Sequence, residues 1–119
     1  MESGAEGKHP EHFGRMNDPT ASARVKGACG DEMEFYLVVE NDILNEVLFF
    51  TSNGCDDTKK AGEAVAEMAE GENVMDALDI SPRKVYDSIR ENVPEEGRHC
   101  SILATITLYK AIADYLLKP

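Results

Sequence analysis

Three cysteines are the residues of this 119-residue chain best suited to chemistry, and they lie far apart. Cys29 and Cys55 are separated by 26 positions, and Cys55 and Cys100 by 45. In a reducing compartment, an odd number of widely spaced cysteines argues against a disulfide framework. Three roles remain possible for these cysteines: buried core thiols, a catalytic thiol, or ligands of a metal. Three thiolates and one further donor would fill a tetrahedral zinc site or the four terminal positions of a [2Fe–2S] cluster.

Each cysteine lies at the boundary of a predicted element, where loops between rigid elements commonly carry function. Cys29 lies in a glycine-rich loop that ends at Asp31, Cys55 follows Gly54, and Cys100 follows His99. Glycines let the backbone approach a metal closely. The alternative is that the three thiols are small core residues, since cysteine is among the most buried residue types. Spacing without a CxxC pair does not decide between these interpretations.

The neighbours of the cysteines predict different thiolate stabilities. We expect the thiolate of Cys100 to be favoured by the helix dipole and by the adjacent pair 98–99, Arg-His. Asp56 and Asp57 should disfavour the thiolate of Cys55, while Lys59 and Lys60 partly offset this effect.

Two strands are predicted over residues 33–40 and 43–52, which are rich in Val, Leu, Phe and Tyr. The turn residues 40–42 between them predict an antiparallel hairpin, and a short first strand is expected over 22–26. One face of the first hairpin strand is apolar: Met33, Phe35, Leu37 and Val39. The second strand has apolar residues on both faces. This predicts either a central strand or one covered by helices on one side and loops on the other.

Helical patterns follow Cys55. A helix starting at Asp56-Asp57 should stop near Gly71, and a short helix is expected over 73–78. Ser81-Pro82 predicts the start of a third helix, which Pro94 is expected to end. The longest helix is expected from His99 or Cys100 to Leu117. Its predicted apolar face consists of Ile102, Leu103, Ile106, Tyr109, Ala113 and Leu116.

Strands followed by helices predict an α+β fold, with a small three-stranded antiparallel sheet, helices packed on one face and a long C-terminal helix. Residues 1–20 are polar and aperiodic, and we interpret them as a flexible N-terminal arm with a short ordered piece near His12 and Phe13. We expect no metal role for His9 or His12. Residues 21–119 form the single folded domain.

The net charge of −11 indicates the partners that this chain avoids. Such a surface repels phosphate backbones and anionic lipids, so we expect neither nucleic acid nor a membrane as a partner. No secretion signal is recognisable at the N-terminus, and no apolar run approaches the roughly 18 residues of a membrane span. These features predict a cytoplasmic protein.

Three ordered motifs resemble the cysteine motifs of the NifU/IscU-type scaffold family. They are Ala-Cys-Gly-Asp-Glu-Met at 28–33, Ser-Asn-Gly-Cys at 52–55 and His-Cys-Ser-Ile-Leu-Ala at 99–104. Residues 14–19 and 111–115 extend the resemblance, which covers about residues 12 to 116. The resemblance implies a NifU/IscU-like scaffold domain over 21–119. It also implies that a transient [2Fe–2S] cluster would be built on this domain from iron and from sulfur delivered by a cysteine desulfurase, and would then be passed to recipient apoproteins.

The same resemblance implies roles for individual residues. Cys29, Cys55 and Cys100 would be ligands and persulfide acceptors, Asp31 the acidic group that keeps the site labile, and His99 an alternative ligand. From the residues alone, Asp31 could equally be a loop carboxylate that caps a turn, and His99 a half-exposed histidine at a helix start. The resemblance also implies that Zn(II) can bind in the same pocket. Whether Asp31 or His99 completes the site stays open.

Alternatives to the cluster scaffold share the same cysteines. The first is a zinc-binding sulfur-transfer protein, although the insertion of such relatives between Cys55 and Cys100 is missing. The second is an interaction domain with buried thiols and no metal. Residues 93–98 read Val-Pro-Glu-Glu-Gly-Arg where chaperone-dependent scaffolds carry Leu-Pro-Pro-Val-Lys, so we do not expect a dedicated Hsp70 chaperone. No nucleophile–base pair or phosphate-binding loop is recognisable, which predicts a carrier and not an enzyme. We expect a monomer or weak dimer.

Overall fold

The computed structural model describes residues 11–27, 30–52 and 55–118. Three strands form one antiparallel sheet in the order β1-β2-β3, with β1 at Ala21–Lys26, β2 at Glu32–Glu40 and β3 at Ile43–Phe50. Four α-helices follow: α1 at Asp56–Ala69, α2 at Val74–Ala77, α3 at Pro82–Ile89 and α4 at Arg98–Leu117. A single 3₁₀ turn, η1, spans Glu95–Gly97. The predicted α+β fold with a long C-terminal helix is confirmed.

The β2–β3 hairpin turns at Asn41 and Asp42, which both have positive φ angles, of 55° and 64°. Two consecutive residues with positive φ are typical of the tight hairpin turn that matches the twist of antiparallel strands. A bulge between Val38 and Val39 then shifts the register by one residue, so that Phe35 faces Phe49 across the two strands. The predicted apolar face of β2 is confirmed, because Met33, Phe35, Leu37 and Val39 are all buried.

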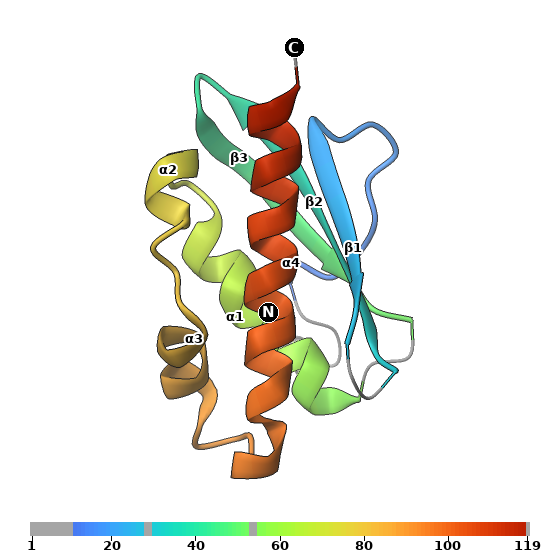
Figure 1. Ribbon diagram of the computed structural model, residues 1–119, viewed down its shortest axis with the longest axis vertical. Coiled ribbons are helices and arrows are strands. Elements are labelled where there is room, and N and C mark those ends of the chain that lie inside the picture. The colour runs from blue at the N-terminus through green and yellow to red at the C-terminus, as the bar shows by residue number, and fades with distance from the viewer. Residues whose placement is uncertain (1–10, 28–29, 53–54, 119) are drawn as a thin grey trace, which may run out of the picture.

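The helices cover one face of the sheet (Figure 1). α4 runs along β1 and β2, while α1 packs against β3 and α4, and α3 packs on α1 and α4 from outside. The core between these layers contains Phe35 and Phe49 from the sheet with Val65 from α1 and Leu108 from α4. This shared core fixes the positions of α1 and α4 relative to the sheet.

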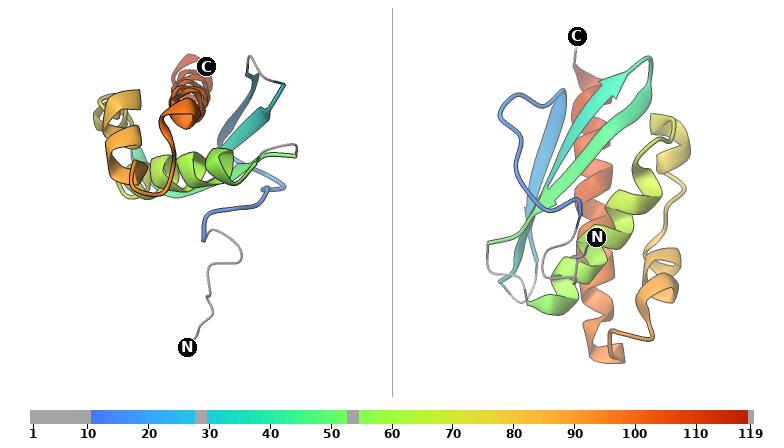
Figure 2. Two further views of the ribbon diagram at one scale, coloured as in Figure 1. Left: turned by 90° about the horizontal axis from the view of Figure 1, so that it is seen from below. Right: turned by 180° about the vertical axis from the view of Figure 1, so that it is seen from behind.

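Strand β3 lies at the edge of the sheet, so the prediction that it is central is wrong and the alternative is confirmed. Residues 11–20 cross the far face of the sheet (Figure 2), and Phe13 stacks on Phe50 with 5.1 Å between ring centroids. Phe13 also forms an isolated bridge with Phe49. At the other end of β3, Gly71 donates to the Leu44 carbonyl at 2.7 Å. The free edge of β3 is thus covered at both ends.

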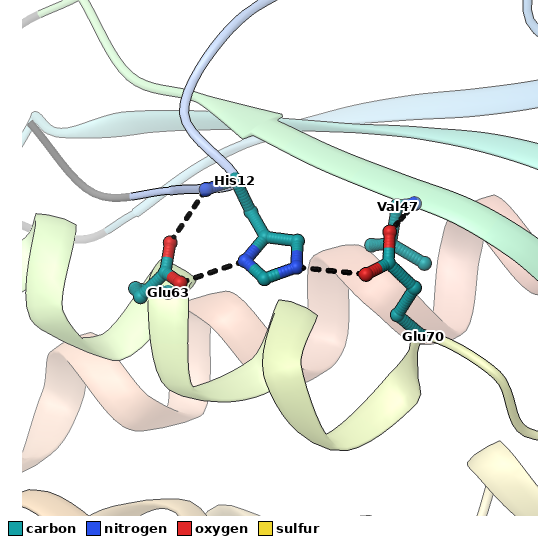
Figure 3. Close-up of polar contacts among 4 residues, drawn as sticks. All are labelled: His12, Val47, Glu63 and Glu70. Carbon is teal, nitrogen blue, oxygen red and sulfur yellow. Dashed lines mark hydrogen bonds and ion pairs between the residues drawn. The ribbon is translucent and has the colours of Figure 1, made fainter. Parts of the chain in front are cut away.

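A histidine and two glutamates cover the middle of that edge (Figure 3). His12 Nδ1 lies 2.7 Å from Glu63 Oε2, and His12 Nε2 lies 2.9 Å from Glu70 Oε1. The other oxygen of Glu70 accepts the Val47 amide at 3.1 Å. Both ring nitrogens of His12 therefore face carboxylates, one on α1 and one at its C-terminal cap, and these fasten the segment around His12 and Phe13 to the folded domain.

The predicted apolar face of the longest helix is wrong in part. Ile102, Ile106, Ala113 and Leu116 are exposed, whereas the buried face includes Leu103, Ala104, Leu108, Ala111 and Ile112. The helix is apolar almost all the way round, so its periodicity did not single out the face that meets the sheet. The third helix also ends earlier than predicted, at Ile89, and Pro94 instead precedes η1.

Residues Glu95–Leu117, which comprise η1 and α4, form the one span in the described residues that is long and apolar enough to cross a membrane. This corrects the expectation that no segment reaches that length. Half of its most apolar window is buried inside the protein, as is typical of a core helix.

Candidate metal centre

Three ligand-bearing side chains, remote in sequence, converge at one end of the molecule. Asp31 lies just before β2, Cys55 lies just before α1, and Cys100 lies in the first turn of α4. One ligand atom from each residue lies within 4.8 Å of the other two. The beginnings of α1 and α4 both lie toward the lower end of the view in Figure 1. Of the five predicted site residues, these three are thereby brought together, while Cys29 lies outside the described residues.

The loop that carries Asp31 is closed by its own backbone. The Gly27 amide donates to the Asp31 carbonyl at 2.6 Å, and the Gly30 amide donates to the Gly27 carbonyl at 3.1 Å. Gly30 has a φ of 90°, a backbone angle that residues with a Cβ rarely adopt. A Cβ on Gly27 would lie 3.2 Å from the Leu103 side chain. The missing side chain therefore lets this loop approach α4.

Cys55 is exposed and occupies the cap position of α1. Its pKa is lowered, first by the Thr58 hydroxyl and then by the Thr58 amide at the start of the helix. The negative charge of Asp57 acts in the opposite direction but is outweighed. The expectation that Asp56 and Asp57 would leave this thiolate disfavoured is therefore wrong, because the sequence did not reveal the hydrogen bonds to sulfur.

Cys100 has the opposite character. It is buried, and its pKa is raised by burial first, with Thr58 acting against this and the charges of Cys55 and Asp31 adding to it. The prediction that the helix dipole and Arg98 would favour its thiolate is wrong, because desolvation dominates at this position. An arriving cation would supply the positive charge that the buried sulfur lacks.

His99 lies beside Cys100 on α4. Its Nδ1 is 2.9 Å from the Glu96 carbonyl oxygen, which can only accept a hydrogen bond, so Nδ1 carries a proton. In the neutral ring Nε2 then presents a lone pair, and it lies 3.7 Å from Cys100 Sγ. His99 is therefore oriented as a potential imidazole donor at the edge of the cluster formed by Asp31, Cys55 and Cys100.

Thr58 is the residue that reasoning from the sequence missed. It is fully buried, and its hydroxyl donates to Asp31 Oδ2 at 2.8 Å. The same oxygen lies 3.4 Å from Cys100 Sγ and 3.6 Å from Cys55 Sγ. A polar residue three positions after Cys55 in a helix that starts at this cysteine shares its face, and this spacing could have revealed it.

The donor set suits a thiophilic metal. Two sulfurs and a carboxylate within 4.8 Å match the ligand types of tetrahedral zinc and of iron–sulfur clusters. One of the two sulfurs is already biased toward the thiolate that such metals bind. The fold and this group of side chains together define an α+β domain with a thiol-containing candidate metal centre at one end.

Comparison with known proteins gives the family. The model of the NifU-like N terminal domain family matches residues 6–119, so this chain belongs to that family. It is 31% identical over 113 residues to an iron-sulfur cluster assembly scaffold protein IscU of Aquifex aeolicus, covering 92% of this chain and 71% of the relative. It is 30% identical over 108 residues to a bifunctional protein NifU/MnmA of Rubrobacter xylanophilus, covering 90% of this chain but only 22% of that longer protein.

A solved structure supports the fold. The crystal structure of a nitrogen-fixing NifU-like protein (N-terminal) from Brucella abortus superposes with a TM-score of 0.71 at 17% identity. The superposition covers 92% of this chain and 88% of that one. The resemblance inferred from the cysteine motifs is therefore confirmed at the level of family and fold.

Proposed function

We propose that this chain is a scaffold on which a transient [2Fe–2S] cluster is assembled and from which it is transferred to recipient apoproteins. The observation that carries this proposal is the convergence of Asp31, Cys55 and Cys100 in a member of the NifU-like N terminal domain family. Relatives of similar length are named iron-sulfur cluster assembly scaffold proteins, which supports the same function.

The cluster is the cargo of the scaffold, and its ligands come from four positions. Cys29, Cys55 and Cys100 supply thiolates, and Asp31 supplies the fourth donor, with His99 as the alternative. Cys29 enters by its place in the family motif, two residues before Asp31. Three thiolates and one oxygen or nitrogen donor fill the terminal positions of a [2Fe–2S] cluster.

Sulfur reaches the scaffold from a cysteine desulfurase as a persulfide. An acceptor thiolate of the scaffold attacks the outer sulfur, so a new S–S bond forms as the desulfurase S–S bond breaks and its thiolate leaves. Reduction of the transferred sulfur to sulfide takes two electrons from an external donor, for which dithiothreitol serves in vitro. The exposure of Cys55 supports such a transfer, because a partner can reach this thiol.

In this proposal the chain is a carrier and not an enzyme, since the catalytic turnover of cysteine belongs to the desulfurase. We further propose that it acts in the cytoplasm as a monomer or weak dimer, without a dedicated Hsp70 chaperone. The chain has 23 acidic and 12 basic side chains, and this negative charge favours binding to partners with basic surfaces.

Anaerobic reconstitution tests the function. Metal-free protein is incubated with ferrous iron, cysteine, a catalytic amount of cysteine desulfurase and dithiothreitol, and its visible absorbance is followed. We expect a brown protein with about two irons and two sulfides per cluster, and loss of the colour in Cys55→Ser and Cys100→Ser variants. Ser101→Ala is the matched control next to the site. A colourless protein with no bound iron would overturn the scaffold function.

A zinc-binding sulfur-transfer protein is the second candidate. The convergence of thiols with a carboxylate supports it, because both are ligands of zinc and a thiolate that leaves the metal can accept persulfide sulfur. On this alternative, protein purified without oxygen contains one zinc per chain, and after metal removal the reconstitution above leaves it colourless although it accepts persulfide sulfur. Metal analysis of protein purified without oxygen separates the two functions.

A further inference from the structure

One hydroxyl group contacts Asp31, Cys55 and Cys100, the three side chains that converge in the candidate metal centre. Thr58 lies in the first turn of α1 and is fully buried. Its Oγ1 lies 2.8 Å from Asp31 Oδ2, 3.4 Å from Cys100 Sγ and 3.6 Å from Cys55 Sγ. These donors come from three separate segments of the chain, so Thr58 joins them at a single point.

The chemistry of a hydroxyl sets the direction of these contacts. It has one proton to donate and two lone pairs that accept. A carboxylate only accepts, so the proton of Thr58 points to Asp31, at the shortest of the three distances. The same proton is shared more weakly with Cys55 or Cys100 when that sulfur is a thiolate, and the lone pairs accept from the S–H group of a protonated sulfur. Because the hydroxyl engages Oδ2, the second oxygen of Asp31 stays available as a ligand.

We propose that Thr58 is a positioning residue of the candidate metal centre, holding the Asp31 carboxylate beside the two thiols so that Asp31, and not His99, supplies the oxygen or nitrogen donor. This inference rests on the proposed function, since it requires that the site binds a metal. Carboxylates that bind metals are themselves held by outer hydrogen bonds, and loss of such a bond typically costs 10- to 100-fold in metal affinity. Thr58 provides this bond through a side chain of restricted rotation at a buried helical position.

Zinc affinity of matched variants tests the proposal. Zn(II) binding to the metal-free full chain is measured by competition with a chromophoric chelator. Thr58→Val keeps the shape and removes the hydroxyl, and we expect it to bind zinc about tenfold or more weakly. Thr58→Ser keeps the hydroxyl, and we expect an affinity near that of the parent. Thr107→Val is the control, because Thr107 is also buried but its hydroxyl bonds the Leu103 carbonyl of its own helix.

A double-mutant cycle separates positioning from general destabilisation. If Thr58 acts through Asp31, then Thr58→Val weakens zinc binding in the parent but adds little in an Asp31→Ala background. Equal zinc affinity of parent and Thr58→Val, or the same loss with and without Asp31, overturns the inference while leaving the proposed function intact. A parent chain that binds neither zinc nor iron overturns the proposed function, and the inference with it.

Discussion

Cys55 is exposed and Cys100 is buried, so a reagent in solution can reach the first of these two thiols more easily than the second. The pKa of Cys55 is lowered by the hydroxyl and amide of Thr58, whereas the pKa of Cys100 is raised by burial. The thiolate is the reactive form of cysteine, so both accessibility and charge state favour reaction at Cys55.

We therefore expect iodoacetamide at pH 7.5 to modify Cys55 at least about tenfold faster than Cys100 in the metal-free protein. Mass spectrometry of the two cysteine-containing peptides in quenched time points measures both rates. Cys55→Ser should remove the fast reaction at this position and Cys100→Ser should leave it. Equal rates at Cys55 and Cys100 would contradict the assignment.

Asp31 supplies a harder donor than a thiolate, and an oxygen ligand should weaken retention of an iron–sulfur cluster. We expect Asp31→Ala to slow the loss of the cluster after reconstitution, measured as the half-life of visible absorbance under air. Glu32→Ala is a close control, since it removes the neighbouring carboxylate, which lies outside the convergent group. An Asp31→Ala protein that bleaches as fast as the parent counts against this role.

At the scale of the elements, Gly62 sets how closely α1 approaches the sheet. A Cβ at this position would overlap the ring of Phe49, which is fully buried. Glycine normally weakens a helix interior by about 1 kcal/mol relative to alanine, so its presence here is explained by crowding.

We expect Gly62→Ala to lower the free energy of unfolding by about 1–3 kcal/mol, because overpacking outweighs the gain in helix propensity. Urea denaturation followed by circular dichroism measures this. The loss should shrink when Phe49→Leu is the background, because the smaller side chain makes room. A Gly62→Ala protein more stable than the parent would show that α1 does not rest on this ring.

The segment that carries His12 is fastened to α1 by a titratable group. Burial alone would lower the pKa of His12, but its hydrogen bonds to Glu63 and Glu70 outweigh burial, and the pKa is raised above 6.5. A raised pKa in the folded state means that the contribution of His12 to stability is complete below the unfolded value. It is lost as the pH rises through the folded value.

The difference in Tm between the parent and His12→Gln should therefore be largest at pH 6 and shrink toward pH 9. Thermal unfolding in a pH series measures it. Glu67, whose pKa is raised by burial and by the charge of Glu63, faces the same cluster and is present in both proteins. A difference that grows with pH would contradict the protonated form of His12.

Local patterns predicted the elements well where one signal dominated. Three patterns each specified one conformation that the structure contains. They are the strand with alternating Met33, Phe35 and Leu37, the turn at 40–42, and the helix start at Ser81-Pro82. The buried face of α4 could not be predicted because nearly every face of that helix is apolar. The spacing from Cys55 could have placed Thr58 beside that sulfur. Its contacts with Asp31 and Cys100, like the charge states of the thiols, depend on tertiary packing, which no pattern along the chain encodes. The expected boundary between the arm and the domain at residue 20 stays a prediction.

At the scale of the whole molecule, the candidate metal centre links the sheet to two helices. A metal that binds the folded chain and not the unfolded one stabilises it, by about 2.7 kcal/mol at a free concentration of 100 times Kd. We expect saturating Zn(II) to raise the Tm by about 10 °C, measured by differential scanning fluorimetry.

The chelator EDTA should reverse this rise. Cys100→Ser should respond to zinc much less than the parent, whereas Thr107→Val, altered on the same helix away from the donors, should respond as the parent does. A rise of the same size in Cys100→Ser would place the zinc elsewhere in the molecule.

Helix α4 contributes Cys100 to the donor group and Leu108 and Ile112 to the core, and it follows every other described element in the sequence. A ribosome therefore releases it after the sheet and the first three helices. Until then, the growing polypeptide has neither the complete donor group nor the helix that covers β1 and β2. A nascent chain that stalls before residue 98 therefore lacks Cys100, and its donor group is limited to the residues that precede α4.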